Sequence, residues 1–315
     1  MPKRFLLLAC LLALAMPAAR ADDDDLESTL GEVGEQYAIA YLTPLVHSFG
    51  ANQNSGLFHT AHIPRRSLTF SIGLKVQGAH LSAGDQSFRR VLGNVALNDY
   101  LDLEPGDPYY GATGDVVFEG PTAIGDDEVE GTATAYVDGL PVYQEGTISG
   151  LVKTRWVPLV VPELQVGGFA GLKGSLRWVP ESDVPEVGQT KLFGYGLQWS
   201  PNVLLPAWPV DVIVGFARQE IDVGTLLETE ASSVFVAASK QYGLATLYGG
   251  LAKESSSVKV SYVEEFTGDP VEFEMDGVME SRVTIGTTLD LGVMVNLEAG
   301  IGDLAVYNFG LLFGK

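Results

Sequence analysis

Residues 305–313 read AVYNFGLLF, and every second position in this stretch is apolar, with aromatic rings at Tyr307, Phe309 and Phe313. The residues between them, such as Asn308 and Gly310, are of mixed character. Alternation over about ten residues has the two-residue period of a β-strand whose two faces meet different surroundings. The stretch therefore predicts a closing strand that separates two solvents.

The same period recurs along the chain. Apolar residues from Leu68 to Val76 alternate with polar ones, and most residues of 282–300 follow the same pattern, with apolar side chains from Val283 to Leu297 at odd positions and polar ones from Thr284 to Glu298 at even positions. Further strands are expected at 164–171, 172–179, 191–199, 210–217, 232–240, 242–253 and 256–264. The polar face suits a wet lumen, and single-chain bacterial barrels close with an even number of strands. We predict an all-β protein, an antiparallel transmembrane β-barrel of about 12 strands, with 10 to 14 as the range.

The N-terminus predicts export. Lys3 and Arg4 precede an apolar stretch at 5–16, and Ala19-Arg20-Ala21 resembles a cleavage site, so residues 1–21 are expected to be a signal peptide. Cys10 is the only cysteine and lies in this leader, where a lipoprotein processing site is the less favoured alternative. Together with the barrel pattern, the leader predicts localisation in the bacterial outer membrane.

Residues 22–66 are expected to form a periplasmic N-terminal helix and plug. Apolar residues recur at helical spacing over 26–49, with Gly50 as a stop, and an amide-rich, turn-forming segment follows at 51–62. A helix ahead of the first strand commonly packs in the lumen. The candidate ligand or plug residues are Tyr41, His47, Asn52, Asn54, Ser55, His59 and His62.

Residues 67–315 are expected to form the barrel, interrupted by a long acidic loop at about 82–156 that caps one mouth. Residues 91–152 carry twelve acidic residues and no Lys or Arg. This excess is consistent with solvated loops, or with a negative vestibule that attracts cations. A net charge of −21 argues against nucleic acid as a partner, because a polyanion requires clustered Lys and Arg.

Several motifs resemble an uncharacterised family, a domain of unknown function, of predicted bacterial outer-membrane β-barrel proteins. They are AYLTPL at 40–45, FGA at 49–51 and NSGLFHTA at 54–61, followed by VPELQVG at 161–167, LFGYGLQ at 192–198, LPAWPVD at 205–211 and LYGGL at 247–251. The resemblance covers most of the mature chain, is least close at 91–152, and implies a barrel, with no established activity. Long-chain fatty-acid channels offer a looser analogy in architecture, an N-terminal plug before a barrel, without a shared residue motif.

No cofactor, metal or enzymatic activity is expected. His59 and His62 have the spacing of a metal pair but lack an evident third ligand. Ser71, His80 and Asn94 are the residue types of an outer-membrane lipid hydrolase, yet their spacing is not diagnostic. No Gly-x-Ser-x-Gly elbow, phosphate loop or dinucleotide fingerprint occurs.

Six charged residues are predicted to point into the lumen: Lys75, Lys173, Arg177, Asp211, Asp290 and Glu298. They would set ion preference in an open pore. Alternatively, they would form salt bridges that fill a narrow barrel and fix the plug. The pattern leaves both alternatives open.

The first hypothesis is a plugged channel for passive uptake of a small or hydrophobic solute. The alternatives are a closed structural or surface-interaction barrel, and an outer-membrane lipid hydrolase. The expected partners are outer-membrane lipid and lipopolysaccharide, the barrel-assembly machinery through strand 303–313, and a small hydrophobic solute.

Overall fold

Ten antiparallel strands close a barrel within the residues that the computed structural model describes, which are 26, 30, 33–184, 188–264 and 268–314. The predicted signal peptide lies outside these residues. The barrel strands are β1 (Arg66–His80), β6 (Trp156–Phe169), β7 (Leu172–Val184), β8 (Gly188–Trp199), β9 (Asp211–Val223), β10 (Leu227–Tyr242), β11 (Ala245–Val263), β13 (Ser281–Asp290), β14 (Met294–Ile301) and β15 (Ala305–Gly314).

The barrel closes because β1 pairs on one side with β6 and on the other with β15, while β10 pairs with β11. Its strand number is the lower end of the predicted range. Residues 245–263 form one long strand where the sequence pattern predicted two. The far half of β11 pairs with β12 (Pro270–Asp276) rather than with β13, so β12 continues the line of β13 beyond the barrel.

The outer face of the barrel is apolar and the inner face is polar, as the alternation predicted. On β1, Leu68, Phe70 and Ile72 are exposed, whereas Ser71, Lys75 and Gln77 are buried. On β15, Tyr307, Phe309, Leu311 and Phe313 are exposed. A soluble protein would bury such residues, so a continuous apolar exterior around a polar interior identifies a transmembrane barrel.

The two rims of the barrel differ. We call the end that carries Arg66 and Gly314 the C-terminal rim, and the end that carries His80 and Trp156 the module rim. At the module rim the aromatic rings of Trp156 and Tyr307 lie 5.6 Å apart on the outer face, which is the usual place of an interfacial aromatic girdle.

Helix α3 (Glu35–Gln53) covers most of the predicted helix at 26–49 and ends four residues after it; Leu26 and Leu30 are helical as well, and residues 27–29 and 31–32 lie outside the described residues. Gly34 is its N-cap, and the amide-rich stretch that was predicted to follow the helix supplies its last turn. Pro44 is tolerated within it, and the Ser48 hydroxyl donates to the Pro44 carbonyl at 2.7 Å. None of the described helical stretches is both long and apolar enough to cross a membrane.

The predicted acidic loop is largely a four-stranded antiparallel sheet, which corrects the expectation for 82–156. Its strands are β2 (Ser87–Ala96), β3 (Thr113–Pro121), β4 (Glu130–Val137) and β5 (Leu140–Ser149), flanked by the short helices η1 (Ala83–Gln86) and η2 (Leu97–Asp99). A third short helix, η3 (Pro201–Val203), lies between β8 and β9. The strand signal was weak because the buried positions are partly small, as at Ala133 and Ala135, and the exposed neighbours are acidic. We call strands β2–β5 the sheet module.

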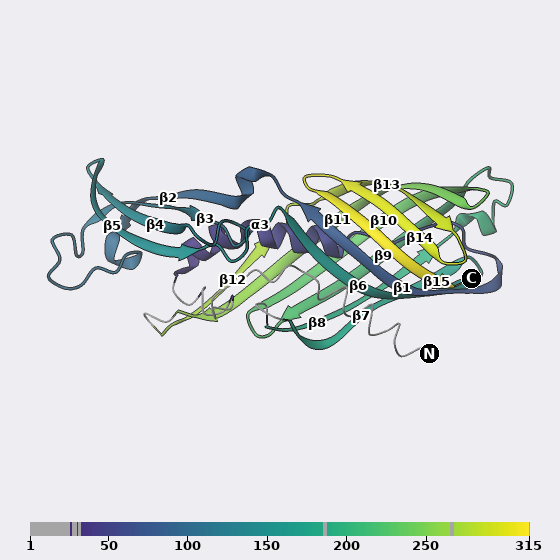
Figure 1. Cartoon of the computed structure of the whole chain (residues 1–315), viewed down its shortest axis with the longest axis horizontal. Coiled ribbons are helices and arrows are strands. Elements are labelled where there is room, and N and C mark those ends of the chain that lie inside the picture. Colours follow the sequence, from purple (N-terminus) through teal and green to yellow (C-terminus); the bar gives the residue numbers. More distant parts are fainter. Residues whose placement is uncertain (1–25, 27–29, 31–32, 185–187, 265–267, 315) are drawn as a thin grey trace.

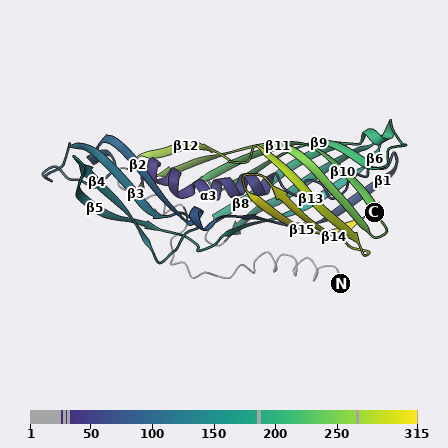
Figure 2. The same cartoon turned by 90° about the horizontal axis from the view of Figure 1, so that it is seen from above.

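The molecule is elongated, with the sheet module at one end, the barrel at the other and α3 between them along the long axis (Figures 1 and 2). The N-terminal half of α3 packs in one core with the module and with the ends of β8–β12. This core includes Tyr37, Leu42, Phe118, Val223 and Tyr262. The ring of Tyr37 meets that of Phe118 edge-on at 5.5 Å. Outside the barrel, the chain therefore has a core like that of a soluble domain.

Phe118→Ala should destabilise this core by about 3 to 5 kcal/mol, because it leaves a cavity around Tyr37. Val91→Ala is the matched control, since Val91 is 49% exposed on the neighbouring strand β2. Hydrogen exchange should accelerate across 87–149 in the first variant only, with barrel amides near the C-terminal rim unchanged. Equal exchange in the two variants would contradict the packing described.

Candidate functional site

The lumen is occupied by residues 51–62, which we call the luminal segment. Its backbone and side chains hydrogen-bond to nine of the ten described barrel strands. The partners are Lys75 on β1, Val157 on β6, Arg177 on β7, Gln198 on β8, Gln219 on β9, Thr229 and Ser239 on β10, Ser255 on β11, Arg282 and Thr288 on β13, and Glu298 on β14. The wall therefore holds the segment from almost every direction.

Gly56 is the central contact of the luminal segment. Its N–H donates to Glu298 Oε1 at 3.0 Å, while its carbonyl accepts from Lys75 Nζ and, at 2.6 Å, from Arg177 Nη2. Its φ of +63° favours glycine, and a Cβ at this position would collide with the Asn308 amide. The N–H and the carbonyl of Gly56 are therefore both hydrogen-bonded to charged side chains of the wall.

A buried ion-pair cluster surrounds this turn. Glu163 accepts from Lys75 Nζ and from Arg177 Nε, both at 2.7 Å, and from Gln165 at 2.6 Å. None of the three charged side chains is more than 3% exposed. A buried charge is tolerated when it is paired and its remaining donors are satisfied, and the luminal carbonyls meet that condition for Arg177.

Arginines of the wall cap the C-terminal end of α3. Arg177 Nη1 donates to the Gln53 carbonyl at 3.2 Å, and Arg282 Nη2 donates to the Ala51 carbonyl at 2.6 Å. Arg282 is also paired with Glu254 at 2.8 Å. The last carbonyls of a helix lack intrahelical partners and carry partial negative charge, so arginines are the natural partners there.

A second polar chain begins at Glu298. Tyr248 donates to Glu298 Oε2 at 3.0 Å, and Asn296 donates to the Tyr248 hydroxyl at 2.7 Å. Thr288 then donates to the His59 carbonyl at 2.7 Å. This chain fixes the part of the luminal segment that follows Gly56.

Two apolar clusters flank the polar layer. Toward the C-terminal rim, Phe58 stacks on Phe235 at 5.2 Å within a cluster that includes Leu57 and Ile63. Toward the module rim, Ala51 packs with Met279 and other apolar residues. The ion pairs are consequently separated from both mouths by apolar side chains.

The structure places the predicted plug residues unequally. Asn52, Asn54, Ser55 and His59 are buried in the lumen, but His62 is exposed at the C-terminal rim, 3.2 Å from Asp211. Tyr41 and His47 lie on α3. The Tyr41 hydroxyl donates to the Ser149 carbonyl of β5 at 3.1 Å, so Tyr41 joins the helix to the sheet module rather than plugging the barrel. The reason is that α3 extends beyond the barrel wall.

Among the predicted lumen-lining residues, Lys75, Lys173, Arg177 and Glu298 are buried inside the barrel. Asp211 is partly exposed at the rim, and Asp290 is exposed at the β13–β14 turn, where it accepts from the Gly292 N–H. These two residues stand at strand ends, at the rim of the barrel, where a side chain on the inner face meets solvent instead of the lumen. The sequence reasoning missed Glu163, Gln219, Glu254 and Arg282, although strand alternation gave the signal that could have found them.

The residue types considered for metal or hydrolytic chemistry do not come together. No group of three or more His, Cys, Asp or Glu that could hold a metal occurs in the part of the chain that the structure describes. Ser71 and His80 lie on the same strand β1, so nine residues of strand, about 30 Å, separate them. Asn94 is in β2 of the sheet module.

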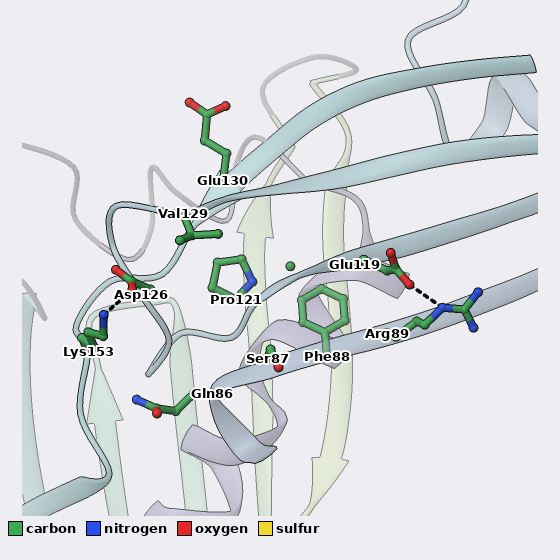
Figure 3. A pocket seen from close by; sticks show the side chains of 11 residues that line it. Gln86, Ser87, Phe88, Arg89, Glu119, Pro121, Asp126, Val129, Glu130 and Lys153 are labelled. Carbon is green, nitrogen blue, oxygen red and sulfur yellow. Dashed lines mark hydrogen bonds and ion pairs between the residues drawn. The ribbon is translucent and has the colours of Figure 1, made fainter. Parts of the chain in front are cut away.

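An open hollow of about 630 Å³ lies at the base of the sheet module, away from the lumen (Figure 3). Phe88, Pro121 and Val129 line it, with the pairs Arg89–Glu119 and Lys153–Asp126 at its sides. Both pairs lie at the surface, with Asp126 half-buried, and the hollow is open to solvent. The lumen, where buried side chains of the wall bind defined atoms of the luminal segment, is therefore the stronger candidate for the functional site.

The whole chain, residues 1–315, matches a family described as a family of unknown function (DUF6588). No curated protein matches it. Solved structures that align with it include a loop-deletion mutant of OmpT from Vibrio cholerae, at 13% identity, 79% of this chain, 99% of that chain and a TM-score of 0.25. OmpF of Salmonella typhi in complex with daunomycin aligns at 9% identity, over 79% of this chain and 98% of that chain, with a TM-score of 0.23. With scores this low, the barrel assignment rests on the strand pairing of this chain.

Glu163→Gln should destabilise the barrel by about 3 to 5 kcal/mol, because it leaves Lys75 and Arg177 buried with too little negative charge. Glu230→Gln is the matched control. Its carboxylate is also 2.7 Å from an arginine, Arg218, but on the exposed outer face, so a small change is expected.

The measurement for this pair is urea unfolding from lipid vesicles, followed by tryptophan fluorescence. Similar midpoints for the two variants would show that the buried cluster is not a stabilising element of the barrel.

Proposed function

We propose that this chain, which belongs to the family of unknown function DUF6588, is a closed outer-membrane barrel that anchors the sheet module at the membrane surface. In this proposal the barrel does not conduct. Its role is to hold the module and the N-terminal half of α3 in a fixed position, with the acidic surface of the module as the interacting face.

One observation carries the proposal: the luminal segment is bonded to nine of the ten described barrel strands. The bonds that involve charged side chains are roughly twice as strong as neutral ones. A barrel with few strands also has an interior that side chains can fill. Displacing residues 51–62 would leave Lys75, Arg177 and Arg282 without their carbonyl acceptors, which opposes spontaneous opening.

The outer-membrane location is supported by the apolar exterior and by the pattern of the closing strand. The sheet module supports a surface role because it has its own core with α3 and thus a defined shape. Its strands and loops contain most of the acidic residues of 91–152.

A plugged channel is the second candidate, favoured by a separate observation. Several luminal amide oxygens are buried without a hydrogen-bond donor, among them those of Asn52, Asn54 and Gln77. Such groups would be hydrated if the segment moved and the lumen opened. In that case the ion pairs of the wall would line a polar path.

The intact protein should show no steady conductance in planar bilayers. To test movement of the segment, we would compare it with Gly56→Cys/Asn308→Cys, reduced and oxidised. An ideal Cβ at position 56 lies 3.1 Å from Asn308 Cγ. A disulfide places a Cβ about 3 Å from the partner sulfur, so the pair can lock the segment to β15.

Silence of the wild-type and of both redox forms is the expected result. Steady conductance of the wild-type would overturn the closed barrel. Openings that appear in the reduced form and in the wild-type, and vanish on oxidation, would assign the protein to the plugged-channel class.

A further inference from the structure

We infer that the luminal segment is an additional passage of the chain across the membrane, so that α3 and the sheet module lie on the outer side and Gly314 lies in the periplasm. The inference rests on the proposed outer-membrane location and adds the orientation of the barrel. It differs from the expectation of a periplasmic N-terminal helix.

The barrel begins and ends at one rim. Because the described barrel has an even number of antiparallel strands, the first residue of β1 and the last residue of β15 must lie at the same end. The register agrees, since Ser71 pairs with Gly314 and Arg66 with Phe169. Figure 1 places the C-terminus at the end of the molecule away from the sheet module.

The luminal segment runs from the module rim to the C-terminal rim. Near its start, Asn52 donates to Val157, the second residue of β6, which lies at the module rim. Near its end, the Ala61 N–H donates to Ser239, four residues from the β10–β11 turn at the C-terminal rim. Arg66 then starts β1 and leads the chain back. The segment thus crosses the full height of the lumen, and α3 is left on the side opposite to Gly314.

The connections identify the sides. At the C-terminal rim the chain turns within residues 170–171, 243–244 and 291–293, with one longer connection at 200–210. At the module rim two turns are also short, at 224–226 and 302–304, but the connection between β1 and β6 spans residues 81–155 and contains the whole sheet module, and the connection between β11 and β13 contains β12. Outer-membrane barrels have short periplasmic turns and longer extracellular loops, which assigns the module rim to the outside.

This orientation has a consequence for assembly. If the wall closed first, α3 would have to pass outward through a lumen that is narrow enough for side chains to fill. The barrel must therefore close, between β1 and β15 or at another seam, around a chain whose N-terminal part already extends outward. The apolar cluster at Phe58 and the ion pairs at Gly56 then fix it.

The test uses single cysteines in the full chain with Cys10→Ser as background, since Cys10 is its only cysteine. Leu140→Cys lies at the β4–β5 turn of the module and Leu204→Cys beyond η3 at the C-terminal rim. The two leucines are 68% and 71% exposed, so they form a matched pair. Intact cells are treated with a membrane-impermeant maleimide, with a periplasmic protein as the control for leakage, and the labelling is repeated after lysis.

Labelling of the 140 variant on intact cells, with the 204 variant labelled only after lysis, is the expected result. Labelling of the 204 variant alone, or of both variants equally in cells whose periplasmic control stays unlabelled, would overturn the orientation while leaving the closed barrel in place. If the protein does not fractionate with the outer membrane, the proposed outer-membrane location fails instead.

Discussion

The structure depends on one constraint: the C-terminal end of α3 and the turn that follows must find hydrogen-bond partners inside a membrane barrel. A helix leaves its last carbonyls unsatisfied, and water is scarce at this depth. Three side chains of the barrel wall supply these partners. Arg177 donates to the carbonyl of Gln53, Arg282 to that of Ala51, and Lys75 to that of Gly56. The described buried luminal charges are four cations (Lys75, Lys173, Arg177, Arg282) and three anions (Glu163, Glu254, Glu298). The partial negative charge of the helix end complements Arg177 and Arg282, which donate to its carbonyls.

The same constraint explains how the two parts of the molecule are joined. Because α3 ends in the lumen but begins in the core of the sheet module, its position is fixed at both ends. Tyr37 and Tyr41 donate to the carbonyls of Ile148 and Ser149 at the edge of the sheet, which also protects part of that edge from pairing with another strand. Because the barrel wall holds the C-terminal end of α3 by hydrogen bonds, it also orients the module, and this is why we assign the barrel an anchoring role.

The sequence predicted the barrel well because its period is strict. Leu68 to Val76 alternate without interruption, and in residues 305–313 every second side chain is apolar and faces outward, although Val306 and Leu312 on the inner face are apolar too. The inward direction of Lys75, Lys173, Arg177 and Glu298 followed from the same period. The sheet module was missed because a solvated sheet over a small core needs few large apolar residues. The partners of the luminal segment could not be predicted either, since the contact of Gly56 with Arg177 joins residues 121 positions apart.

The bonds between the luminal segment and the wall keep the lumen closed as long as the charged layer stays dry. A hydrogen bond that can exchange with water contributes only about 0.5 to 1.5 kcal/mol net, whereas a buried charge without a partner is far more costly. The Phe58 cluster on one side and the Ala51–Met279 cluster on the other keep water from the ion pairs at Gly56. These apolar layers give the charged layer its strength. If either were opened, water could replace the luminal carbonyls and the segment would become movable. The difference between a closed anchor and a plugged channel therefore lies in the two apolar layers, while both share the same charged wall.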